Sequence, residues 1–114
     1  MVKDVFKQGD IVLFDFGPGL GHEQLGRRPG IVLSHESYNQ QSGMMIAAPI
    51  TSRKSRYRFD VEIIDERGDT KGIVAADQMK CIDVGARKPK LLGKISEANL
   101  RIIKGKLQAL LIQD

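Results

Sequence analysis

Short apolar runs separated by turn residues predict that most of this chain folds as strands. Residues 11–16 form such a run, entered after Gly9 and Asp10 and closed by the Gly-Pro-Gly segment at 17–19. The other strand candidates are bounded by Gly, Pro, Asn or Ser and span residues 30–34, 44–49, 59–64, 72–76 and 78–82. Six short strands at close spacing predict a small, curled, mostly antiparallel sheet or barrel.

Only the C-terminal region shows a clear helical pattern. Ser96 is a candidate N-cap, and apolar residues recur after it at helical spacing, at Leu100, Ile103, Leu107, Leu110 and Leu111. This spacing places one apolar stripe on a helix, with most basic residues off the stripe. The sequence therefore predicts a mainly β fold that ends in one amphipathic α-helix.

Length and composition indicate one ordinary globular domain covering residues 1–114. Hydrophobic residues make up 41% of the chain and charged residues 28%, which is typical of a folded protein. No apolar run approaches the roughly 20 residues of a membrane helix. Charges at Lys3, Asp4 and Lys7 occupy the place where a signal peptide would have its apolar core. We therefore expect a soluble, cytoplasmic protein with no membrane association.

The cysteine and histidine content argues against disulfides and metal sites. The single cysteine, Cys81, has no intramolecular partner and lies in an alternating run that favours a small buried core residue. His22 and His35 have no second His or Cys at ligand spacing. We expect no metal and no other cofactor.

The positive charge is unevenly distributed, although the net charge is only +4. Residues 53–58 contain four bases and no acid, and residues 80–106 contain eight bases and two acids. Residues 59–79, in contrast, contain six acids and two bases. Such segregation fits a basic face that attracts nucleic acid, and the alternative is a set of solvated loops rich in Lys and Arg.

The connection after the first predicted strand is long and contains several ionisable and polar side chains. Between residues 17 and 29 it contains four glycines together with His22, Glu23, Gln24, Arg27 and Arg28. Long loops held by a rigid sheet often carry binding or catalytic groups. A flexible glycine-rich connection whose charges face water is the alternative.

At this loop the sequence resembles the MazF/PemK family of toxin endoribonucleases, and the likeness runs over nearly the whole chain. The matching segments follow one another in the family's order, at 9–11 (Gly-Asp-Ile), 21–24 (Gly-His-Glu-Gln), 26–29 (Gly-Arg-Arg-Pro), 32–34 (Val-Leu-Ser), 38–39 (Tyr-Asn), 48–51 (Ala-Pro-Ile-Thr), 72–74 (Gly-Ile-Val) and 77–78 (Asp-Gln). The resemblance implies a homodimeric SH3-like β-barrel with a C-terminal helix. It also implies sequence-specific, metal-independent cleavage of single-stranded RNA, neutralisation by an acidic antitoxin protein, and DNA binding together with that antitoxin.

Metal-free RNA cleavage uses the neighbouring 2′-OH as nucleophile. The protein must remove the proton of this hydroxyl, stabilise the phosphoryl oxygens and protonate the leaving 5′ oxygen. The resemblance assigns catalysis to Arg28 and Thr51. A guanidinium suits the phosphoryl oxygens because its planar fork engages two of them, and the Thr51 hydroxyl offers a neutral donor.

The general base has more than one candidate. Glu23 can accept a proton if burial raises its pKa, and His22 has a suitable ordinary pKa. MazF-like members emphasise the Glu, whereas PemK-like members use a His with an Arg and an Asp on a later strand. Asp77 stands at that Asp position here, but Ala75 occupies the position of the PemK-like Arg. We rank Glu23 first, with His22 and Asp77 as further catalytic candidates.

RNA binding is predicted for a set of basic, aromatic and amide residues that can contact phosphates, stack on an unpaired base or read a base edge. The set is Arg27, Arg53, Lys54, Arg56, Tyr57, Arg58, Gln78, Arg87 and Lys88. Two rival functions remain open. One is a gyrase-poisoning toxin of the CcdB type, whose Trp-containing C-terminal end this chain lacks. The other is an RNA-binding module without catalysis.

Overall fold

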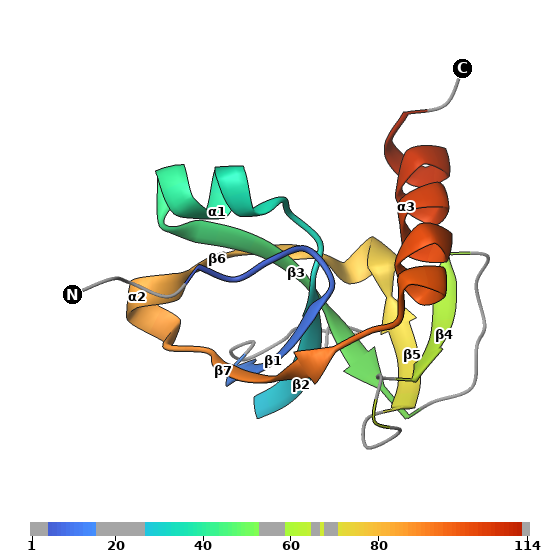
Figure 1. Cartoon of the computed structure of the whole chain (residues 1–114), viewed down its shortest axis with the longest axis horizontal. Helices are drawn as coiled ribbons and strands as arrows, with labels where there is room; N and C mark the ends of the chain where they lie inside the picture. The colour runs from blue at the N-terminus through green and yellow to red at the C-terminus, as the bar shows by residue number, and fades with distance from the viewer. Residues whose placement is uncertain (1–4, 16–26, 53–58, 65–66, 68–70, 113–114) are drawn as a thin grey trace.

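The computed structural model describes residues 5–15, 27–52, 59–64, 67 and 71–112. These residues form a curled, antiparallel, seven-stranded sheet in the order β4-β5-β3-β2-β1-β7, with β6 also paired to β3 (Figure 1). The strands are β1 (Asp10–Asp15), β2 (Arg27–Val32), β3 (Met44–Thr51), β4 (Asp60–Ile64), β5 (Lys71–Ala75), β6 (Lys80–Asp83) and β7 (Lys90–Lys94). The helices are α1 (Glu36–Ser42), α2 (Val84–Arg87), α3 (Glu97–Leu111) and a 3-10 turn, η1 (Ala76–Gln78).

Strand β3 holds the sheet together because it pairs with three other strands. Its residues 47–49 pair with β2, with Gly30 opposite Pro49. Its N-terminal half, residues 44–47, pairs with β6, and its last two residues, 50 and 51, pair with β5. The sheet therefore curls around β3, and β5 and β6 diverge from each other along this strand.

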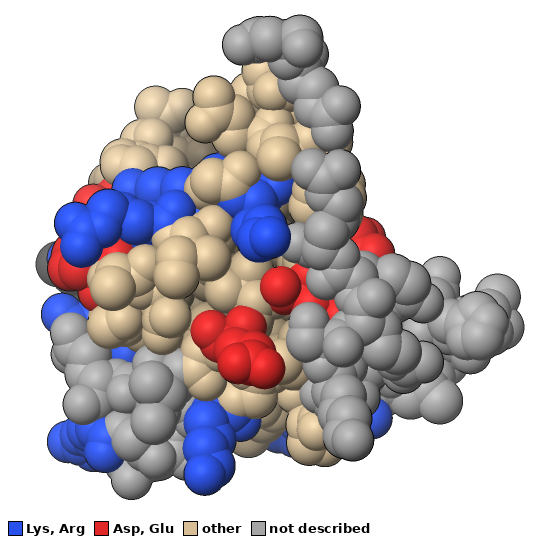
Figure 2. Space-filling model, turned by 90° about the vertical axis from the view of Figure 1, so that its right-hand side faces the viewer, with Lys and Arg blue, Asp and Glu red and all other residues tan. Residues whose placement is uncertain are grey.

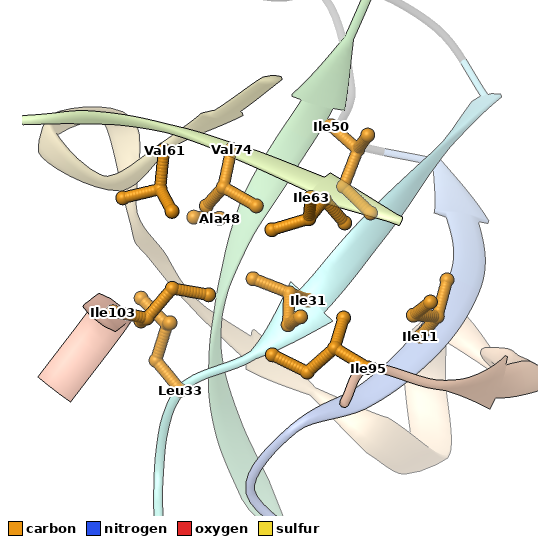
Figure 3. Close-up of a cluster of buried hydrophobic side chains, with 10 residues drawn as sticks. All are labelled: Ile11, Ile31, Leu33, Ala48, Ile50, Val61, Ile63, Val74, Ile95 and Ile103. Carbon is orange, nitrogen blue, oxygen red and sulfur yellow. The ribbon is translucent and has the colours of Figure 1, made fainter. Parts of the chain in front are cut away.

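Each face of the sheet carries its own apolar cluster. The first, cluster A, comprises Ile11, Ile31, Leu33, Ala48, Ile50, Val61, Ile63, Val74, Ile95 and Ile103, whose side chains converge in Figure 3. The second, cluster B, comprises Val12, Phe14, Val32, Met45, Ala47 and Ile82. Successive residues of a strand point to opposite faces, so Ile11 and Val12 belong to different clusters. The strands therefore have short continuous apolar runs in the sequence, because their side chains are buried on both faces of the sheet.

Helix α3 covers cluster A through a narrow apolar stripe. The Ser96 hydroxyl accepts a hydrogen bond from the Asn99 N–H at 3.1 Å, which confirms the predicted N-cap. Ile103 is buried, and Leu100 and Leu107 pack against the cluster. The stripe is shorter than predicted, since Leu111 is 63% exposed at the end of the helix.

Helix α1 is a further departure from the predicted single helix. Its N-cap is His35, whose Nδ1 accepts the Ser37 N–H at 3.1 Å. It ends at Gly43, where φ is 71°, a left-handed conformation that glycine adopts without strain. Its buried residue is Asn39, which donates from Nδ2 to the carbonyl oxygens of Phe6, at 2.8 Å, and Ser34, at 3.2 Å. Hydrogen bonds therefore hold α1 where an apolar stripe would hold an ordinary amphipathic helix.

The predicted mainly β barrel with a C-terminal helix is confirmed, with four corrections. The structure adds the helices α1 and α2 and the strand β7. The prediction of a buried Cys81 is wrong. Cys81 is exposed, with its Sγ 3.5 Å from the Tyr38 hydroxyl. Alternate residues of β6 point to opposite faces, and the buried position belongs to Ile82. Within the described residues, no helix is long and apolar enough to cross a membrane. A single domain over residues 1–114 stays a prediction.

Candidate active site

Arg28 lies at the point where β2 leaves β3. Residues 27–31 of β2 pair with β1, with Arg28 opposite Phe14, but the pairing with β3 covers only residues 30–32. Pro29 has no N–H to donate and fits this unpaired side of the strand. Directly opposed residues of neighbouring strands project to the same face. Arg28, which is partly exposed, is therefore on the face of cluster B, together with Phe14.

Thr51 ends β3 on this same face. It is 8% exposed and pairs with Ile73 of β5. Continuing the register of Gly30 opposite Pro49 by two residues sets Thr51 opposite Arg28, and two steps along a strand preserve the face. The two residues predicted to handle the phosphate thus lie on one face, at the place where the pairing of β2 with β3 stops, which we call the mouth.

Asp77 and Gln78 lie in η1, which packs against β3, β4 and α3. Asp77 is exposed, and Gln78 is partly buried. Among the part of the chain that is described, the buried Oε1 of Gln78 has no hydrogen-bond partner. A buried acceptor without a donor costs free energy, and because this oxygen is buried it does not itself offer an edge to a nucleobase; base reading by Gln78 stays a prediction.

The remaining predicted residues are scattered or lie outside the described residues. Arg27 is exposed at the start of β2, opposite Asp15. Arg87 and Lys88 are exposed at the end of α2, where Lys88 has φ 48° and donates its N–H to the Val84 carbonyl at 2.9 Å. The residues outside the described ranges are His22, Glu23, Arg53, Lys54, Arg56, Tyr57 and Arg58.

Charges on the side of the molecule that carries α3, β4 and β5 do not form one continuous field. Figure 2 shows that Lys and Arg side chains lie above and below two groups of acidic side chains on this side. Glu62 of β4 is exposed, and Asp60, at the start of that strand, is buried. The described charges of this side therefore alternate in sign, and the acidic groups repel a polyanion locally.

The described residues offer no cluster of three or more His, Cys, Asp or Glu that could hold a metal ion. The predicted catalytic side chains that share the face of cluster B are the Arg28 guanidinium and the Thr51 hydroxyl. These groups donate hydrogen bonds and positive charge to an anion. The arrangement can bind a phosphate and stabilise added negative charge on its oxygens.

Residues 7–111 match the sequence model of the PemK-like, MazF-like toxins of type II toxin-antitoxin systems. The chain belongs to this toxin family. The family predicted from the ordered motifs is therefore confirmed, and the match spans every described strand and helix.

Individual members of the toxin family are similar over almost the full length. The endoribonuclease toxin MazF of Escherichia coli strain K12 is 37% identical, over 90% of this chain and 91% of its own length. The crystal structure of MazF from Deinococcus radiodurans superposes with a TM-score of 0.84 at 37% identity, covering 97% of this chain and 100% of that one. A MazE-MazF crystal structure from the same organism superposes with a TM-score of 0.80 at 34% identity, with the same coverage.

Sequence reasoning missed two residues on the site face. The sequence pattern predicts only a strand position for Phe14, yet in the structure this residue stands opposite Arg28. Lys80 of β6 stands opposite Ala47 of cluster B and so projects to that face. The signal for Lys80 was present, since a lysine inside an apolar alternation marks a strand end that opens to solvent.

Proposed function

We propose that the protein is a toxin endoribonuclease that cleaves single-stranded RNA by attack of a ribose 2′-OH, without a metal ion. Family membership supports the activity, and the placement of Arg28 and Thr51 on one face, at the mouth between β2 and β3, carries the mechanism. A phosphate that enters this mouth meets a guanidinium and a hydroxyl from two different strands. Holding such groups on a rigid sheet removes the need to reorganise them during the reaction.

The reaction balances with groups of the chain and the RNA alone. The 2′ oxygen forms a bond to phosphorus, and the bond from phosphorus to the 5′ oxygen breaks. The base takes the 2′-OH proton, an acid returns a proton to the 5′ oxygen, and the products are a 2′,3′-cyclic phosphate and a 5′-OH end. Arg28 stabilises the phosphoryl oxygens with two parallel N–H groups, and Thr51 donates its hydroxyl to the same phosphate.

Proton transfer falls to residues of the loop and of η1. Glu23 is the proposed base, and His22 and Asp77 are the alternative partners in proton transfer or in orienting Arg28. Only Asp77 of these three lies in the described residues, exposed on η1. The pH profiles of the Glu23→Gln and His22→Ala variants separate the two loop candidates, because removing the true base abolishes one limb of the profile.

RNA binding, assembly and control complete the proposal. The basic side chains at 53, 54, 56 and 58 contact phosphates of the RNA. Tyr57 stacks on a nucleobase, and Gln78 reads the edge of a nucleobase. The protein acts in the cytoplasm as a homodimer, and an acidic antitoxin neutralises it. A MazE-MazF complex of Deinococcus radiodurans, 34% identical in its matched chain, supports the antitoxin part. Charge complementarity between a basic toxin and an acidic partner speeds their association.

Incubation of purified protein with mixed single-stranded RNA in EDTA tests the function. We expect cleavage to cyclic-phosphate ends, whereas binding without cleavage would indicate the non-catalytic module, and neither would indicate a gyrase poison. Arg28→Ala should lower kcat by about 100- to 1,000-fold, as loss of one preorganised donor does elsewhere. Arg101→Ala, on the exposed face of α3, is the matched control for the loss of one positive charge and should cleave normally. Full activity of Arg28→Ala would refute the mechanism.

A further inference from the structure

A pocket of about 470 Å³ lies between the end of β1, β6 and α2. Phe14, Lys80 and Ile82 line it from the face of cluster B. Small-molecule sites in proteins have volumes of about 300–1,000 Å³, so this space is large enough for a ligand. Its apolar lining comes from Phe14, Met44, Ile82 and Ala86. No residue of this lining belongs to the set predicted for catalysis.

The pocket borders the proposed catalytic mouth through Phe14, which lines the pocket and stands opposite Arg28. Asp15, which also lines the pocket, stands opposite Arg27 on the other face of β1. Opposed side chains in antiparallel strands start about 4.5–5.5 Å apart at their Cβ atoms. An RNA strand with one phosphate at Arg28 therefore has its neighbouring nucleotide within reach of the pocket.

The charges around the pocket are mixed. Lys80 and Arg87 supply positive charge, and Asp15 supplies a carboxylate. The carboxylate of Asp83 accepts the Ala86 N–H at 3.2 Å and so fixes the first turn of α2. The pocket thus combines apolar side chains, two cations and two carboxylates, of which Asp83 is already hydrogen-bonded to α2.

A nucleotide has the complementary set of groups. Its base is a flat ring that apolar walls can enclose, its phosphate pairs with lysine or arginine, and its amino or hydroxyl groups donate to a carboxylate. We infer that this pocket binds one unpaired nucleotide of the RNA, next to the cleaved bond. The inference rests on the proposed RNA cleavage and adds a subsite in which Ala86 and Arg87 line the space for the flanking nucleotide.

Trimmed oligonucleotides test the subsite. An RNA that the wild-type protein cleaves is synthesised with 2′-deoxyribose at the attacking position, so that it binds without reacting, and is shortened by one nucleotide from either end. Wild-type affinity should fall by about 5- to 150-fold when the nucleotide in the pocket is removed, the usual effect of one enclosed base. Ala86→Phe fills the pocket, so this variant should bind the longer and shorter RNAs equally.

Matched controls keep the failure of the subsite separate from failure of the proposed function. Gly85→Ala changes the same helix outside the pocket, where the new Cβ meets only Asp83 Oδ1 at an ordinary 3.5 Å, and should keep the wild-type affinity difference. If wild-type protein cleaves RNA but Ala86→Phe still gains affinity from the flanking nucleotide, the subsite is refuted and the nuclease stands. A wild-type protein that neither binds nor cleaves RNA overturns both.

The contact between Arg87 and an RNA phosphate has an independent test, which does not depend on the Ala86→Phe variant. Arg87→Ala should reduce the slope of log affinity against log salt by about 0.7, the value for one contact to a single-strand phosphate. Arg101→Ala should leave the slope unchanged. An unchanged slope in Arg87→Ala as well would refute the phosphate contact.

Discussion

Gly72 allows β5 to approach the end of β3 more closely than any other residue would. A Cβ added at Gly72 would lie 2.7 Å from the carbonyl oxygen of Thr51 and 3.0 Å from Cγ2 of Ile50. The first of these atoms belongs to the backbone and cannot rotate away. Gly72→Ala must therefore push β3 and β5 apart at Thr51, the residue that faces the proposed phosphate.

Two opposing effects set the magnitude for Gly72→Ala. Replacing a strand glycine with alanine ordinarily gains about 0.5–1 kcal/mol, because the unfolded chain loses freedom. Overpacking a well-filled site destabilises by about 1–3 kcal/mol. The backbone contact makes overpacking dominant, and we expect a net loss of about 1–2 kcal/mol in the free energy of unfolding. A displacement near 1 Å at Thr51 would lower kcat by about 100-fold.

Urea unfolding and RNA cleavage rates measure these two losses separately. Gly105→Ala in α3 is the matched control, because the added Cβ would have no described atom outside its own helix within 4 Å. This control should gain about 0.8–1 kcal/mol, the difference in helix propensity. Wild-type stability and activity in Gly72→Ala would show that β3 and β5 are not in close contact at Thr51, and the placement of Thr51 would be wrong.

Two further substitutions probe the edges of the fold. Asn39→Ala removes the donor to the Phe6 and Ser34 carbonyl oxygens and should lower the free energy of unfolding by about 2–3 kcal/mol in urea titrations, whereas Gln40→Ala, exposed on the same helix, should have little effect. Burial raises the pKa of Asp10 above 3.8, so its ionisation destabilises the folded state as pH rises through that raised pKa. Asp10→Asn should therefore gain stability relative to wild type as pH rises from about 4, the ordinary Asp pKa, to about 7, and a difference that is constant with pH would contradict this.

The strands were predictable from sequence because their residues must bury both faces of a curled sheet. The elements that were missed lack that signal. The buried residue of α1 is the polar Asn39, and in β7 the neighbouring Leu91 and Leu92 are both exposed, at 56% and 39%. Neither element shows an apolar period, so hydropathy could not reveal it.

The candidate site was predictable only in part. Pro29 marked the extended backbone at Arg28, and the family resemblance pointed to Thr51. That the two share a face depends on the register of β2 against β3, with Gly30 opposite Pro49. Register between strands joined by a helix and loops is a property of tertiary packing, and no local pattern in the sequence specifies it.

The three partners of β3 determine how the molecule opens. An amide of β3 can exchange its hydrogen with solvent only when β2, β5 or β6 has separated from it. Such amides exchange through global unfolding, whereas frayed edges exchange through small local openings. The amides of β3, the strand that ends at Thr51, should therefore exchange most slowly. The hydroxyl proposed to donate a hydrogen bond to the phosphate is thus attached to the last part of the protein to unfold.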